Sequence, residues 1–96
     1  MPAYVIADVK KITDPAIYKE YLTRITPMIH AHGGKFLVLG GSPQPLQGAW
    51  NANRIVVIEF EDLARARTWW ESKGQREMQI LRRQSTDTDI ILVEGR

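Results

Sequence analysis

Short runs of aliphatic and β-branched residues alternate along the chain with segments of helical period. Such runs favour extended backbone, and turn-forming residues set them apart from the segments in between. The runs cover residues 3–9, 35–39, 54–60 and 89–94. Because helical segments follow the first and the third run, we predict one α+β domain over residues 1–96, with the order βαββαβ and a four-stranded antiparallel sheet.

The first helix has clear start and stop signals. Asp14 can cap the free amides of the first turn, and Pro15 suits the first helical position. Apolar side chains and one histidine then recur at three- and four-residue steps along one helix face: Ile17, Tyr21, Ile25, Met28, Ile29 and His32. Gly33 and the glycine after it end this helix, and Pro27 predicts a kink or a break near residues 24–26.

A long connection follows the second strand. Residues 40–53 contain glycines and prolines that form turns, and the segment is longer than the roughly 2 to 5 residues of an ordinary hairpin loop. We therefore expect a lid over a pocket or an arm that reaches a partner. Further on, Asp62 predicts the start of a second helix, Gly74 a stop or bend in it, and residues 75–84 a further helical stretch.

The strands are apolar on both faces. Side chains of a strand alternate between the two faces of a sheet. In the third strand both alternating sets are apolar: Ile55 and Val57 on one face, and Val56, Ile58 and Phe60 on the other. The helices of this topology cover one side of the sheet, so we predict that the other apolar face packs against a second copy, as a homodimer.

The composition narrows the class of protein. There are 13 basic and 11 acidic residues, and a net charge of +2 is a weak sign of anionic partners. The chain has no cysteine, which excludes disulfides and thiolate chemistry. No apolar stretch approaches the roughly 18 residues of a membrane helix. We expect a cytoplasmic protein without a membrane segment.

Two histidines are the acid–base candidates. His32 lies on the apolar stripe, so it can face a pocket, or it can stabilise the C-terminal end of the helix. His30 lies off the stripe, and the spacing of the two does not align metal ligands on one helix face. The sequence also has no phosphate loop or nucleotide-binding motif. We therefore predict neither a metal nor a cofactor.

Two carboxylates lie within apolar strands. Asp8 and Glu59 each need a partner or a pocket there, and Arg54 is the natural candidate. An ion pair, within the chain or between subunits, that fixes the sheet register is one interpretation, and a substrate-polarising carboxylate with a raised pKa is the other.

Three tryptophans are many for so short a chain. Trp69 and Trp70 are predicted to pack in the core or an interface. Trp50 lies in the long connection, where it can close a pocket or insert into a partner subunit. RNA-recognition modules of the same βαββαβ order stack bases on aromatic residues in their two central strands. Here residues 55–58 of the third strand are aliphatic and the first strand offers only Tyr4, so we do not expect nucleic-acid binding.

Several local patterns together resemble the family known as domain of unknown function 1330, within the dimeric α+β barrel superfamily. They cover most of the chain: residues 18–21, 32–37, 46–50, 54–60, Ala66, 69–72, Arg82 and 93–95. One departure follows Ser72, where the family has a proline and then a Tyr-Gln pair and this chain has Lys73, Gly74, Gln75 and Arg76. An aromatic residue near the expected pocket is thereby replaced.

The resemblance implies a ferredoxin-like protomer, a homodimer whose sheets form a barrel, and no established reaction. Other branches of the superfamily include monooxygenases that act on polycyclic aromatics without a cofactor, haem-degrading enzymes and stress-response proteins. Since one fold supports such different activities, it does not select among them.

Our leading hypothesis is a small-molecule pocket between the sheet and the first helix, for an aromatic or acidic ligand. We expect it to be lined by Tyr18, Tyr21, His32, Trp50, Arg54, Trp69 and Ser72. In a cofactor-independent enzyme, His32 or a strand carboxylate would act as the base and Arg54 would hold an anionic group. The alternative is a non-catalytic binding or regulatory module whose tryptophans and strand charges serve dimerisation. An enclosed, polar-lined cavity reached by His32 and Arg54 favours the first hypothesis, and a fully packed protomer the second.

Overall fold

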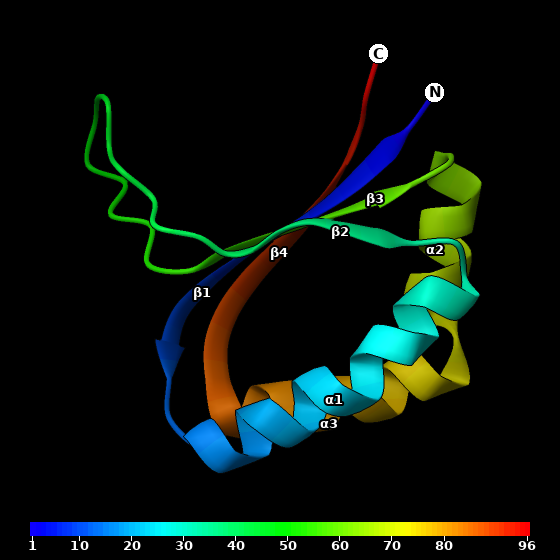
Figure 1. The fold of residues 1–96 in the computed structure, drawn as a ribbon, viewed down its shortest axis with the longest axis horizontal. Coiled ribbons are helices and arrows are strands. Elements are labelled where there is room, and N and C mark those ends of the chain that lie inside the picture. The colour runs from blue at the N-terminus through cyan, green and yellow to red at the C-terminus, as the bar shows by residue number, and fades with distance from the viewer.

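The predicted strands form one antiparallel sheet in the order β2-β3-β1-β4 (Figure 1). The computed structural model describes all residues, 1–96. The strands are β1 Ala3–Ile12, β2 Lys35–Gly40, β3 Ile55–Phe60 and β4 Thr86–Glu94. The helices are α1 Pro15–Ala31, α2 Leu63–Glu71 and α3 Lys73–Ser85. This is the predicted α+β architecture with βαββαβ order, the second helical segment being split in two.

Helix α1 begins as predicted and continues through its proline. The carboxylate of Asp14 accepts a hydrogen bond from the Ile17 N–H at 3.1 Å, which caps the first turn. Pro27 lies inside the helix, whose ribbon changes direction about halfway along without a break (Figure 1). A break is avoided because Ile25 and Ile29, on either side of the proline, are both buried in the core.

The interruption between α2 and α3 falls at Ser72 and not at Gly74. The Ser72 hydroxyl donates to the Trp69 carbonyl at 2.7 Å and accepts from the Gln75 N–H at 3.3 Å. One side chain therefore closes α2 and caps α3. Gly74 lies in the first turn of α3 and faces Met28 of α1.

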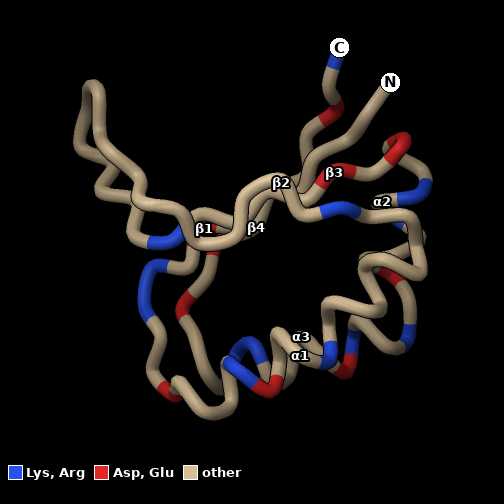
Figure 2. Tube along the Cα trace, viewed as in Figure 1, with Lys and Arg blue, Asp and Glu red and all other residues tan.

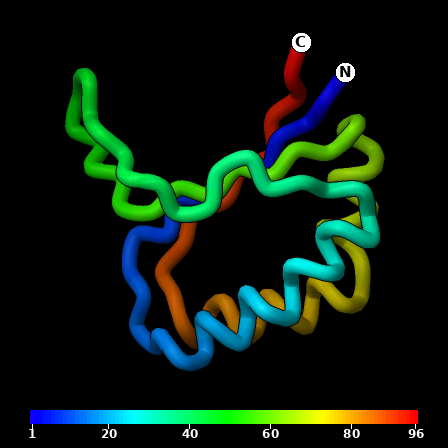
Figure 3. Tube along the Cα trace, viewed as in Figure 1, coloured from blue at the N-terminus to red at the C-terminus, as the bar shows by residue number.

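The core lies between the helices and one face of the sheet. The buried strand positions alternate, as in Val5, Ala7 and Val9 of β1. They pack against buried residues from all three helices, with Phe60 and Trp69 stacked at a centroid distance of 5.4 Å. Both termini lie at the same end of the sheet (Figure 3), where the Gly95 N–H donates to the Pro2 carbonyl at 2.7 Å.

The opposite face of the sheet is apolar and uncovered in the protomer. Ile6 lies between Val57 and Ile91 in the strand register, and these side chains share that face. Ile91 is 59% exposed and Val93 42% exposed. We call this surface the open face.

The connection between β2 and β3 extends away from the sheet (Figure 1). Residues 41–53 contain no charged side chain, as the uniform colour of this segment in Figure 2 shows. Leu46 is 99% exposed, so the segment contributes little to the core of its own protomer. We call it the arm. Separately, none of the three helices is both long and apolar enough to cross a membrane.

A pair of glycine variants tests how tightly α1 packs on β3. A Cβ at Gly34 would lie 2.6 Å from the Ile29 side chain and 2.9 Å from the Phe60 ring, so Gly34→Ala should lower the free energy of unfolding by about 1–3 kcal/mol. At Gly74 the added carbon would meet the flexible Met28 side chain at 3.2 Å, so Gly74→Ala should be close to neutral. Urea unfolding at one fixed protein concentration measures both. Equal effects would show that the packing at Gly34 is loose.

Candidate functional site

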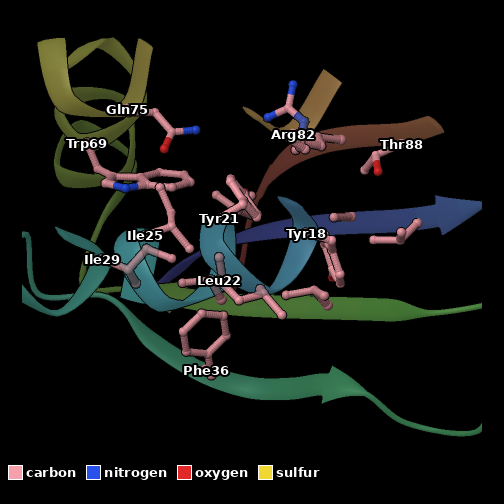
Figure 4. A pocket seen from close by; sticks show the side chains of 16 residues that line it. Tyr18, Tyr21, Leu22, Ile25, Ile29, Phe36, Trp69, Gln75, Arg82 and Thr88 are labelled. Atoms are coloured by element: carbon pink, nitrogen blue, oxygen red, sulfur yellow. The ribbon is translucent and has the colours of Figure 1, made fainter. Parts of the chain in front are cut away.

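A cavity of about 40 Å³ lies between the sheet and helices α1 and α3 (Figure 4). A buried water needs roughly 10–15 Å³ on a comparable measure, and a cavity that binds benzene is about 150 Å³. The space therefore exceeds one water, and an aromatic molecule would enter only if the side chains of the wall moved apart. Of the 16 residues around it, 13 are hydrophobic, and they come from all four strands and all three helices. The site therefore suits a mainly apolar molecule.

One face of α1 forms the wall opposite the sheet. Tyr18, Tyr21, Leu22, Ile25 and Ile29 line the cavity, at the three- and four-residue steps of one helix face. The rings of Tyr18 and Tyr21 stack with a centroid distance of 6.0 Å and an interplanar angle of 20°. Aromatic surface on this wall favours a flat ligand.

Polar atoms without partners project from α2 and α3 into this apolar setting. Gln75 is 1% exposed, and neither its amide oxygen nor its amide nitrogen has a hydrogen-bond partner. The indole N–H of Trp69 and one terminal nitrogen of Arg82 are likewise buried and unpaired. Buried polar groups are nearly always paired in folded proteins, so several unpaired polar atoms around one cavity distinguish this region from the rest of the core.

Tyr21 and Arg82 set the charge at this site. Burial raises the pKa of the Tyr21 hydroxyl above its ordinary value of 10.0, and the positive charge of Arg82 opposes this shift. Tyr21 is therefore neutral at physiological pH and can donate a hydrogen bond. The Arg82 guanidinium also lies 5.7 Å from the centre of the Trp70 ring, which fixes its position.

Ser72 lies behind the cavity wall. Its two hydrogen bonds reach the backbone of Trp69 and of Gln75, which both line the cavity. We predicted a ligand contact for Ser72; the structure places it where it orients two residues that do line the cavity.

The two predicted catalytic residues lie at opposite ends of α1. His32 is the C-cap, and its Nδ1 lies 2.8 Å from the Met28 carbonyl oxygen, outside the cavity lining. Arg54 lies beside Tyr18, in a surface groove that we call the outer groove. Tyr18 and His32 are 14 residues apart, which is roughly 20 Å along a helix. The structure therefore does not bring His32 and Arg54 together.

Trp50 points toward the other side of the molecule. Its indole N–H donates to the Asp8 carboxylate at 2.9 Å, and the residue is 64% exposed. Asp8 shares the open face with Ile6, since side chains two apart lie on one face, so Trp50 does not close the cavity. The arm, which joins β2 to β3, therefore brings Trp50 to the open face.

The predicted partnership of Arg54 with the strand carboxylates is wrong within the protomer. Glu59 pairs with Lys35 at 3.9 Å, between residues that lie opposite each other in β2 and β3. Asp8 is held by the Trp50 indole. Arg54 forms no ion pair, because its guanidinium turns toward the Tyr18 ring of α1.

Sequence reasoning did not identify Gln75 and Arg82 as site residues. Both have polar side chains in a strongly charged helix, where an exposed position is the usual assignment. The available signal was their spacing from Met78, since positions 75, 78 and 82 share one helix face. Gln75 also lies in the stretch that departs from the family pattern.

Solved structures of low sequence identity share this fold. A protein of unknown function from Rhodopseudomonas palustris superposes with a TM-score of 0.74 at 18% identity, over 99% of this chain and 82% of that one. A dimeric ferredoxin-like protein of unknown function from Thermobifida fusca gives 0.63 at 16% identity, over 99% and 92%. SnoaB, a cofactor-independent oxygenase from Streptomyces nogalater, gives 0.60 at 17% identity, over 99% and 91%. At these identities the likeness shows the ferredoxin-like fold alone.

Comparison at the level of sequence gives the family. Among curated proteins none matches the chain. The family model for a domain of unknown function, DUF1330, matches residues 2–96. With its βαββαβ sheet and this match over nearly its whole length, the chain belongs to the DUF1330 family.

Proposed function

We propose that this chain is a homodimeric cytoplasmic protein that binds a small, largely apolar molecule with a polar end in the cavity between the sheet and α1. The observation behind this proposal is the Gln75 side chain, which is almost fully buried and unpaired at the cavity wall. A protomer built only for packing gains nothing from an orphaned amide, whose burial costs about 1–3 kcal/mol. The cytoplasmic location rests on the cysteine-free composition alone.

The wall defines the chemistry of the ligand. Aromatic rings from Tyr18, Tyr21, Phe36 and Trp69 favour an aromatic body. The amide of Gln75 can both donate and accept, and the neighbouring donors suit an oxygen atom on the ligand. A phenol or an aryl ketone satisfies both requirements.

Binding is better supported than catalysis. The lining contains no carboxylate and no imidazole, and the Tyr21 hydroxyl keeps its proton at neutral pH. The sequence-based assignment of His32 as base would require it to reach the cavity from the far end of α1. The oxygenase activity of SnoaB belongs to that protein, and its 17% identity to this chain supports the shared fold only.

The second copy would cover the open face. Ile6, Val57, Ile91 and Val93 form an apolar surface there, which water would otherwise contact. The Thermobifida fusca protein of the same fold is dimeric, which supports this assembly. The arm places Trp50 on the same face, where it would lie against the partner subunit.

Replacing Gln75 separates stability from binding. Gln75→Leu removes the unpaired amide at similar volume, so the free energy of unfolding should rise by about 1 kcal/mol. Binding of para-cresol, whose hydroxyl would meet this amide, should weaken by about fivefold, the effect of one neutral hydrogen bond. Toluene, which lacks the hydroxyl, should bind both proteins equally. Urea unfolding and isothermal titration calorimetry measure these effects.

Gln84→Leu is the matched control for this variant, because Gln84 lies on the same helix and is exposed. It should change the free energy of unfolding by no more than about 0.5 kcal/mol and leave para-cresol binding unchanged. Loss of stability in Gln75→Leu with unaltered para-cresol binding would make the amide structural. If para-cresol does not bind the wild-type protein, the cavity proposal fails.

The buried Tyr21 hydroxyl predicts a fall in stability at alkaline pH. The pKa of this hydroxyl is raised in the folded state. The protonated hydroxyl therefore contributes fully to stability below about pH 10, the ordinary value for the unfolded chain. Above that pH the unfolded chain releases the proton first, so the contribution is lost. Tyr21→Phe should flatten this part of the pH profile of unfolding. The wild-type protein, measured in parallel, gives the reference slope. An identical slope in Tyr21→Phe would refute the assignment.

Two exposed isoleucines test the dimer. Ile91 on the open face and Ile80 on α3 are 59% and 56% exposed in the protomer. Size-exclusion chromatography with light scattering should give twice the 11.0 kDa chain mass for the wild-type protein and for Ile80→Asp. Ile91→Asp should give one chain mass, because a carboxylate buried between two apolar sheets is strongly unfavourable. A monomeric wild-type protein at micromolar concentration would rule out the dimer.

A further inference from the structure

The outer groove adjoins the cavity. It is a surface hollow of about 310 Å³, formed by the end of β1, the first turns of α1 and Arg54. Tyr18 and Leu22 belong to the walls of both spaces, so these two side chains form the partition between them. A shift of either side chain would join the groove to the cavity.

Arg54 is held in a fixed position in this groove. Its guanidinium carbon lies 5.9 Å from the centre of the Tyr18 ring. The backbone of Gly40 also lies close, since a Cβ there would be 3.0 Å from the guanidinium. The Nε atom is buried without a hydrogen-bond partner. A side chain ordered in this way loses little further entropy when it binds an anion.

The positive charge of Arg54 is not neutralised within the protomer. The ion pairs of the structure use other cations: Lys10, Arg24, Lys35 and Arg65. Lys19, on the wall of the same groove, also has no acidic partner. Asp14, whose carboxylate caps α1, forms no ion pair with either cation. Two unpaired cations thus face one groove.

We propose that the outer groove is the second half of the ligand site and binds the carboxylate of an aromatic or alkyl acid whose body enters the cavity between Tyr18 and Leu22. This inference rests on the proposed function. It specifies the ligand as a molecule with a negative charge at one end and a neutral oxygen at the other. Tyr18 has two roles, holding Arg54 and forming part of the entrance.

The layout of the cavity supports an elongated ligand. In Figure 4, Gln75 and Trp69 lie at one end of the lining, and Tyr18 and Thr88 lie at the other. The outer groove adjoins the Tyr18 end. A molecule whose hydroxyl or carbonyl meets Gln75 would therefore direct its opposite end toward Arg54.

Arg54 suits a carboxylate better than Arg82 does. A carboxylate beside Arg82 would be enclosed by apolar walls, and burial of an ion costs several kcal/mol even when it is paired. In the outer groove it would keep part of its hydration and still gain charge-assisted hydrogen bonds. Arg82 can instead donate to a neutral oxygen, at no such cost.

Two matched probes test the inference on the intact protein. Para-hydroxyphenylacetate differs from para-cresol by a carboxylate on the methyl carbon, opposite the hydroxyl. Calorimetric titration of both into the wild-type protein, Arg54→Gln, Arg82→Gln and Arg76→Gln gives the ratio of the two affinities in each. Arg76 is exposed on α3 and forms no ion pair, so Arg76→Gln is the control for the loss of one positive charge.

We expect the acid to bind the wild-type protein about tenfold more tightly than para-cresol, a factor that corresponds to about 1.4 kcal/mol. Arg54→Gln should reduce this ratio to near one and leave para-cresol affinity unchanged, which also shows that the variant is folded. Arg82→Gln and Arg76→Gln should keep the ratio.

The outcomes separate the two proposals. If para-cresol binds but the acid has no advantage, or if the advantage disappears in Arg82→Gln and persists in Arg54→Gln, the outer groove is not the carboxylate site and the cavity proposal stands. If neither probe binds, both proposals fail.

Discussion

The sheet has two apolar faces, and the chain supplies helices for one of them. Val5 and Ile58 point toward the helices and are buried, whereas Ile6 and Val57, their neighbours in the same strands, lie on the open face. Full burial of one such side chain contributes about 1.5–3 kcal/mol, so an uncovered row of them is a strong drive toward association. The same alternation separates the two proposed roles of the sheet: the dimer contact lies on one face, and the cavity lies on the other.

The cavity depends on how α2 and α3 meet. Ser72 interrupts the helical segment and uses its hydroxyl to fix the backbone of Trp69 on one side and of Gln75 on the other. Both side chains then reach the space beneath α1. A leucine at position 75 would pack there without an unpaired amide, so the glutamine lowers the free energy of unfolding. Residues that lower stability in this way are typical of functional sites.

The helices, the strands and part of the cavity lining could be predicted because their sequence signals lie within a few residues of each other. Asp14 and Asp62 cap their helices by accepting hydrogen bonds from the backbone N–H three residues later. The alternation of apolar and polar strand positions is likewise visible within a few residues. Tyr18, Tyr21 and Trp69 were expected at the pocket and do line the cavity, although their contact with a ligand stays a prediction. Local signals of this kind do not predict contacts between distant segments. The arm turns Trp50 toward Asp8, which lies 42 residues earlier in the chain. Arg54 contacts the Tyr18 ring of α1 and not a strand carboxylate.

Alternation along β1 also constrains how a ligand can enter. Val5 faces the cavity and Ile6 the open face, so the strand is shared by the ligand site and the proposed dimer contact. Separating two strands of this sheet would break the hydrogen bonds between them. It would also disrupt the proposed dimer contact on the open face. Helix α1 is less constrained, because it packs mainly against α3 and its outer side is exposed to solvent. The proposed entry of a ligand past Tyr18 and Leu22 would therefore require motion of side chains on one helix face, while the sheet stays fixed.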